Sequence, residues 1–137
     1  MTPIYASTWA DLMAALRRPG GARQLAEQAM AAAEANAELN AYRRIDPAKV
    51  LAEADAADTR RKAYPTAPAL CGLPISAKDL YVVDGYDTFA GTSMALDGHF
   101  PDEGPVVQTL RGQGAVITGK THTVEFAFGG IGTNPHW

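Results

Sequence analysis

Cysteine is nearly absent from this chain of 137 residues, in which Cys71 is the only one. A single cysteine excludes an internal disulfide framework and every metal motif built from paired cysteines. Long apolar runs are absent too, since no stretch approaches the ~18 residues that a membrane-spanning helix needs. The N-terminus also lacks the basic and then apolar layout of a secretory signal. We therefore expect a cytoplasmic protein without a membrane partner.

The chain carries little net charge. Its 12 Lys and Arg residues stand against 15 Asp and Glu residues, which gives a formal net charge of −3. Non-specific nucleic-acid binding needs a basic face that releases counterions from phosphates, so we expect no nucleic-acid partner. Hydrophobic residues make up 47% of the chain, which is enough apolar material for a folded core.

Histidines and serines are too few and too widely spaced for several familiar sites. His99, His122 and His136 lack the i, i+4 spacing of a zinc-binding helix, and with one cysteine we predict no metal site and no cofactor. No serine lies in a Gly-x-Ser-x-Gly elbow, so that type of hydrolase is not encoded here. The serines of the chain are Ser7, Ser76 and Ser93.

Composition changes sharply near residue 64. Residues 1–63 are rich in alanine and include only two of the 13 glycines, Gly20 and Gly21, which favours helices. Residues 64–137 contain the remaining glycines and most of the prolines, which is typical of strands and turns. We therefore predict an N-terminal helical segment over 1–63, followed by an α/β part over 64–137.

Three helices are predicted in the first part. Thr8 and Asp11 form a capping-box-like start for the first helix, and an alanine-dominated second helix is expected over about 22–39. Residues 41–45 alternate like a short strand. Asp46 and Pro47 then supply the N-cap and first position of a third helix that runs to about residue 62.

The second part predicts a strand, a helix and another strand. Residues 73–78 alternate between apolar and other side chains, 105–110 are helical in pattern, and 115–118 form a short apolar strand. Asp84 and Gly85 have the chemistry of a two-residue hairpin turn between residues 81–83 and 86–88. A strand, a crossover helix and a strand in this order predict an α/β unit.

Basic residues are scarce in the second part, where Lys78, Arg111 and Lys120 are the only ones. Lys78 comes at the C-terminal end of the strand over 73–78. Burial of a lysine amine favours its neutral form, which can act as a general base. The alternative is a surface lysine that pairs with Asp79 or another acid, and the pattern alone favours this alternative.

Lys120 lies in the run Gly119–Thr121, which imitates the end of a phosphate-binding loop. Such a loop needs residues 115–118, between Gly114 and Gly119, to lie in a loop, whereas the pattern predicts a strand there. We therefore expect a structural or surface role for Lys120.

Two blocks of the sequence resemble segments of the amidase signature family. They are residues 70–80, LCGLPISAKDL, and residues 114–129, GAVITGKTHTVEFAFG. The order and spacing of the blocks fit the amino-terminal portion of that family, and the resemblance covers nearly the whole chain. It implies an α/β fold with a mixed sheet flanked by helices, of which this chain is the N-terminal helical layer and the first strands.

The resemblance also implies a reaction. In this family a lysine takes the place that histidine has in other serine hydrolases, and that lysine corresponds to Lys78. It draws a proton through a serine on a cis peptide bond from a second serine, which attacks the amide carbonyl and forms an acyl-enzyme. Phe128, Gly129 and Gly130 would border the acyl pocket, whereas the alternative is a plain turn at the end of a short helix.

The family's two serines and its oxyanion hole belong to a Gly/Ser-rich segment that comes later than Trp137. The resemblance therefore implies that this chain supplies only the lysine of the triad and is inactive alone. Its expected partners are a small-molecule amide substrate and the remaining C-terminal part of the amidase. The sequence leaves open a non-catalytic binding or scaffold fragment, a homodimer, and the N-terminal part of an A-type amidotransferase subunit.

Overall fold

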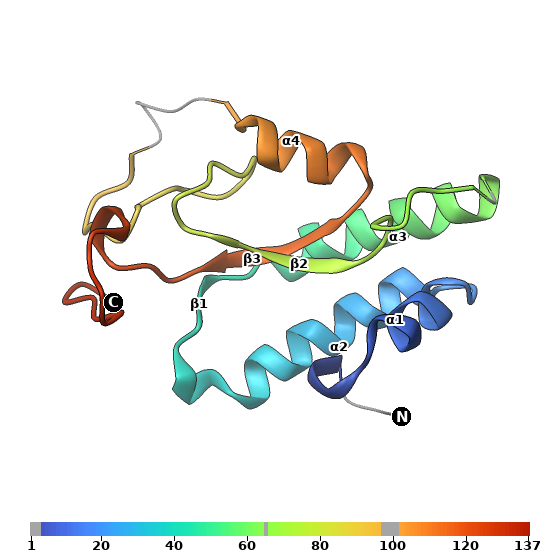
Figure 1. Cartoon of the computed structure of the whole chain (residues 1–137), viewed down its shortest axis with the longest axis horizontal. Helices are drawn as coiled ribbons and strands as arrows, with labels where there is room; N and C mark the ends of the chain where they lie inside the picture. Colours follow the sequence, from blue (N-terminus) through green and yellow to red (C-terminus); the bar gives the residue numbers. More distant parts are fainter. Residues whose placement is uncertain (1–3, 65, 97–101) are drawn as a thin grey trace.

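The computed structural model describes residues 4–64, 66–96 and 102–137 (Figure 1). In these ranges the main elements are α1 (Trp9–Leu16), α2 (Gly21–Ala35), β1 (Tyr42–Arg44), α3 (Pro47–Ala63), β2 (Pro74–Lys78), α4 (Pro105–Gly112) and β3 (Val116–Thr121). Short 3-10 helices are η1 (Ile4–Ala6), η2 (Ala37–Leu39) and η3 (Glu125–Ala127). In the described ranges, no helix combines the length and the apolar character needed to cross a bilayer.

The predicted helix starts are confirmed by their caps. The Thr8 side chain accepts a hydrogen bond from the backbone N–H of Asp11, and the Asp11 carboxylate accepts one from the Thr8 backbone, which completes a capping box. At the start of α3, the Asp46 carboxylate accepts a hydrogen bond from the Lys49 N–H at 3.1 Å. These contacts are local in sequence, which is why the sequence alone could predict them.

The second helix ends earlier than the sequence predicted. α2 stops at Ala35 instead of continuing to residue 39, and η2 follows after Asn36. The Asn36 side chain donates a hydrogen bond to the carbonyl oxygen of Ala32 at 2.7 Å. This bond satisfies one of the carbonyl groups that the last helical turn leaves without a partner, so it stabilises an end at this point.

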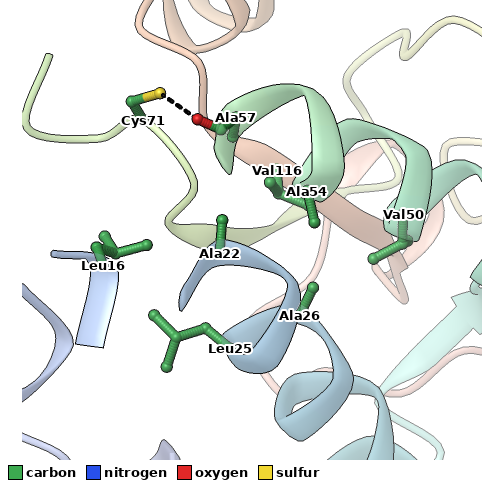
Figure 2. Packing of buried hydrophobic residues seen from close by; sticks show 9 residues of the cluster. All are labelled: Leu16, Ala22, Leu25, Ala26, Val50, Ala54, Ala57, Cys71 and Val116. Atoms are coloured by element: carbon green, nitrogen blue, oxygen red, sulfur yellow. Dashed lines mark hydrogen bonds between the residues drawn. The ribbon is translucent and has the colours of Figure 1, made fainter. Parts of the chain in front are cut away.

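The helices pack through small side chains (Figure 2). α2 contributes Ala22, Leu25 and Ala26 to the buried cluster, and α3 contributes Val50, Ala54 and Ala57. Small residues on both helices allow their axes to approach closely. The same cluster includes Val116 of β3, so the helical layer rests on one face of the sheet.

The three strands form one mixed sheet in the order β1-β3-β2. β1 is antiparallel to β3, and β2 is parallel to β3. α4 crosses between β2 and β3 on the side of the sheet away from α2 (Figure 1), and its Val107 packs with Ile117 and Ala77 in a second buried cluster. The predicted strand, helix and strand unit and the mixed α/β sheet are therefore confirmed.

Two details of the second part differ from the sequence-based expectation. Val83 and Tyr86 form an isolated antiparallel bridge around Asp84 and Gly85, but the described residues on either side of the turn form no strands. The last strand is longer than predicted, since β3 continues through Lys120 to Thr121. Its extension is paired on both sides, by β1 and by β2.

β1 lies within residues 1–63 but pairs with β3 from the second part. The two predicted parts thus share one sheet, and the domain boundary near residue 64 stays a prediction.

An irregularity in β3 adjusts its register with β2. Ile75 pairs with Ile117, but Ser76 pairs with Gly119, so Thr118 is an extra residue on β3. Such a bulge changes which face of the sheet the following side chains occupy. Gly119 passes so close to β1 that a Cβ atom here would collide with the carbonyl oxygen of Arg44.

We expect Gly119→Ala to destabilise the protein by roughly 2 kcal/mol, within the usual range for a strained backbone position. The added methyl group must push β1 away from β3 or displace the bulge. Thermal unfolding of the protein that contains this chain measures the effect. Gly104→Ala is the matched control, because a Cβ atom at Gly104 meets no atom within 4 Å. Equal stability of the two variants would contradict the expectation.

Candidate functional site

The carboxyl ends of β2 and β3 meet at one edge of the sheet, where Lys78 pairs with Thr121. In open α/β sheets, ligands bind beyond the carboxyl ends of parallel strands. Lys78 and Ser76 are exposed on one face of β2, whereas Ala77 and Asp79 are buried on the other. The structure therefore presents the Lys78 amine to solvent at the edge of the sheet where a substrate would be expected.

This exposure decides between the two alternatives for Lys78. The side chain lies on the outward face of β2 and is exposed, so the surface position that the pattern favoured is confirmed and the desolvated amine is not found in this chain. The pair with Asp79 that was expected at the surface is wrong. Asp79 instead lies 3.2 Å from Nε of Arg43 and 2.9 Å from Nζ of Lys120.

These three charged side chains form a buried ion cluster of Arg43, Asp79 and Lys120. The Asp79 side chain is 1% exposed and that of Lys120 is 0% exposed. Arg43 comes from β1, Asp79 follows β2 directly, and Lys120 lies on β3. Buried charges are costly unless they are paired and hydrogen-bonded, so this cluster holds the three strand segments together.

Lys120 has further hydrogen-bond partners in the loop after β2. Its Nζ donates to the carbonyl oxygen of Tyr81 at 2.6 Å and to Oγ1 of Thr88 at 3.0 Å. The structural role expected for Lys120 is therefore confirmed, whereas a surface position is wrong. The β-strand conformation of Lys120 also agrees with the rejection of a phosphate-binding loop.

Arg43 packs against two aromatic rings. Its guanidinium carbon lies 4.4 Å from the centroid of the Phe89 ring and 5.8 Å from that of Trp137. The two rings contact each other edge to face, with centroids 5.1 Å apart. Nε1 of Trp137 donates to the carbonyl oxygen of Thr92. These contacts fold the C-terminal segment back over the loop that follows β2.

The predicted acyl-pocket residues lie in the irregular segment after β3. Phe128 is 96% exposed, and Gly129 and Gly130 are also exposed. Just before them, Phe126 and Ala127 have φ values of 48° and 56°, in the left-handed region that strains residues other than glycine. In the described part of the chain, no hydrogen bond or ion pair joins this segment to Lys78, so the assignment of a pocket stays a prediction.

The histidines occupy different environments. His122 follows β3 and is partly buried; this burial and the positive charge of Arg43 lower its pKa below the ordinary value, although Asp79 acts in the opposite direction. His136 is exposed, and His99 lies outside the described residues. Among the residues that the structure describes, no group of three His, Cys, Asp or Glu side chains is arranged to hold a metal ion.

A groove of about 1020 Å³ is lined in part by Arg43 of the ion cluster, but by neither Asp79 nor Lys120. It runs between the C-terminal part of α2, near Met30, and β1, where it is lined by Tyr42 and Arg43. Lys78 is not part of its lining. The groove is therefore separate from the exposed lysine at the end of β2.

Sequence reasoning missed the ion cluster as a unit. Asp79 and Lys120 each stood in a recognisable block, and the scarcity of basic residues after residue 64 drew attention to Lys120. Arg43 carried no such signal, because it lies in a short strand with another arginine beside it. Only the pairing of β1 with β3 brings Arg43 to the other two residues.

Comparison with known proteins gives a consistent result. The model of the family described as Amidase matches residues 24–136. The chain is 48% identical over 99 residues to the 2-amino-5-chloromuconic acid deaminase of Comamonas testosteroni. This match covers 72% of this chain and 21% of that protein. It is 46% identical over 127 residues to the A-type subunit of the glutamyl-tRNA(Gln) amidotransferase of Bordetella petrii, covering 91% of this chain and 24% of that one.

Solved structures show the same likeness. A crystal structure of an amidase superposes with a TM-score of 0.78 at 32% identity, over 98% of this chain and 30% of that one. The native peptide amidase of Stenotrophomonas maltophilia superposes with a TM-score of 0.78 at 31% identity, over 91% of this chain and 26% of that one. The chain thus spans about a quarter of the length of the relatives it matches.

Proposed function

This chain belongs to the amidase family, and we propose that it is the amino-terminal part of an enzyme that cleaves a carboxylic amide with Lys78 as general base. One observation carries the proposal. Lys78 is an exposed amine at the carboxyl end of β2, inside a stretch that the family model matches. Because the chain spans about a quarter of its relatives, the remaining catalytic groups would come from the rest of the protein.

The proposed reaction has two stages. The oxygen of a nucleophilic serine outside this chain attacks the amide carbonyl, and its proton passes through a second serine to the Lys78 amine. The C–N bond then breaks, the nitrogen leaves with that proton as ammonia or an amine, and an ester to the serine remains. Water attacks this ester with the same relay of protons and releases a carboxylic acid.

The Lys78 amine must be neutral to accept a proton. It is exposed in this chain, and burial by the rest of the protein would favour its neutral form. The strained backbone at Phe126 and Ala127 supports a further assignment, because strain of this kind gathers at functional sites. We therefore keep Phe128, Gly129 and Gly130 as the proposed border of the acyl pocket.

A second candidate is the A-type subunit of an amidotransferase. Relatives with that name match 91% of this chain at 46% identity in Bordetella petrii and 98% at 41% identity in Ralstonia nicotianae. Such a protein would form the same acyl-enzyme with Lys78 as base, but the ammonia released would be transferred to glutamyl-tRNA(Gln). The two candidates share the first stage and differ in the fate of the nitrogen.

Release of ammonia from amides by the full-length protein tests the proposal. We expect turnover of at least one member of a panel that contains glutamine, simple aliphatic and aromatic amides and a peptide amide, with one acid formed for each ammonia. Transfer of the nitrogen to glutamyl-tRNA(Gln) would favour the amidotransferase. A folded full-length protein that releases ammonia from none of these amides, with or without glutamyl-tRNA(Gln), would contradict both candidates.

A further inference from the structure

The buried ion cluster of Arg43, Asp79 and Lys120 lies directly beside the proposed general base, since Asp79 follows Lys78 in the chain. We propose that Asp79 is a positioning residue, held by Arg43 and Lys120, that fixes the direction in which Lys78 leaves the sheet. This inference rests on the proposed function and adds to it a residue outside the family triad.

Alternation along the strand gives the first argument. Successive side chains on a strand point to opposite faces, so a slip by one residue would move every side chain to the other face. Asp79 is 1% exposed and is paired with two cations in the interior. While its carboxylate stays there, Lys78 must face outward, and a slip would place the lysine in the interior and the carboxylate in solvent.

The bulge in β3 gives the second argument. With Thr118 as the extra residue, Lys120 pairs with Ala77 and Thr121 pairs with Lys78. Without it, the register set by Ile75 and Ile117 would continue, and Lys120 would stand beside Lys78. The two ammonium groups would then share one face of the sheet. The bulge therefore moves Lys120 to the buried face, where it meets Asp79.

Hydrogen bonds around Asp79 give the third argument. Its backbone N–H donates to the carbonyl oxygen of Thr121 at 2.9 Å, and its Oδ2 accepts from the Phe89 N–H at 3.2 Å. Lys120 holds the same loop through Tyr81 and Thr88. The backbone that carries Lys78 is thus fixed to β3 and to the following loop immediately after the lysine.

Kinetics of the full-length protein with Asp79→Asn test the proposal. The change keeps the shape of the side chain but removes the charge that holds Arg43 and Lys120. We expect kcat to fall by about 100-fold, the cost of a misplacement of about 1 Å, with KM changed by less than about threefold. Rates are expressed per nucleophilic serine titrated with a covalent serine-hydrolase probe, so that unfolded protein does not count.

A second variant separates positioning from stability. In Asp79→Asn/Lys120→Met the uncompensated Lys120 charge is gone, so the thermal stability lost in the single variant should partly return. If Asp79 positions Lys78, kcat should stay low in this double variant, because the Asp79 carboxylate is still absent. Recovery of kcat together with stability, or an unchanged kcat in any folded variant, would overturn the proposal. Asp55→Asn, which breaks an exposed ion pair with Arg23, is the matched control with unchanged kcat.

A chemical readout distinguishes failure of this proposal from failure of the proposed function. Acetylation by an N-hydroxysuccinimide ester, mapped by peptide mass spectrometry, measures the reactivity of Lys78 relative to the exposed Lys62. We expect Asp79→Asn to change this ratio several-fold even if the full-length protein turns over no amide. In that case the proposed function fails and positioning stands, whereas an unchanged ratio would refute positioning.

Discussion

Replacement of Lys78 by alanine is expected to lower kcat for amide turnover by about 10³- to 10⁴-fold in the full-length protein, at the upper end of what a positioned general base contributes. Without the amine, the nucleophilic serine has no group that accepts its proton. Initial rates of ammonia release measure the loss. KM should change little, since the amine acts on the transferred proton rather than on substrate binding.

The same variant should keep its fold. Within this chain the Lys78 side chain is exposed and takes part in neither of the ion pairs that join Asp79 to Arg43 and Lys120, so its removal should cost the fold little. An unchanged midpoint of thermal unfolding would show that lost activity is not lost structure. Lys62→Ala, at an exposed position in the last turn of α3, is the matched control and should keep full activity. If Lys78→Ala retained more than about a tenth of the wild-type kcat, the assignment of a general base would be wrong.

Replacement of Lys120 by methionine is expected to have the opposite profile, with its largest effect on stability. The change removes a fully buried ammonium and leaves Asp79 with Arg43 as its one remaining cation in the cluster. Removal of one partner from a buried ion pair typically costs about 3–5 kcal/mol, because a buried charge loses its compensation. The carbonyl oxygen of Tyr81 also loses its donor. Urea denaturation of the protein that contains this chain measures the change in unfolding free energy.

A matched substitution shows whether burial is the cause. Arg23→Met breaks ion pairs with Asp55 and Glu27 on the surface, where such pairs contribute about 0–1 kcal/mol. A loss for Lys120→Met no larger than that for Arg23→Met would contradict the assigned role of the buried cluster. A double-mutant cycle with Asp79→Asn should give a large coupling energy, because the two side chains are in direct contact.

Local features were predicted well. Thr8 with Asp11 and Asp46 with Pro47 marked two helix starts, because caps involve residues within one turn of each other. Alternation marked β2 for the same reason. The end of α2 was predicted too late, since alanines continue the helical pattern and the bond from Asn36 back to Ala32 was overlooked.

The candidate site was predicted in part. The block around Lys78 was recognisable, and its alternation placed the lysine on the face opposite Ile75. The pattern favoured a surface position for Lys78, and its exposure in this chain agrees, but the pairing of Asp79 with Arg43 and Lys120 was not predicted. The strained backbone at Phe126 and Ala127 had no signal in the sequence, since nothing in those residue types favours a left-handed conformation.

The sequence by itself determined the order of helices and strands, the family resemblance and the position of Lys78 at the end of a strand. These depend on neighbouring residues or on blocks of contiguous sequence. Only the tertiary structure decided which lysine is buried. Lys120 meets Asp79 because a bulge shifts the register of β3, and Arg43 joins them because β1 pairs with that strand. Burial of a charge depends on partners distant in the sequence, and no local pattern reports such partners.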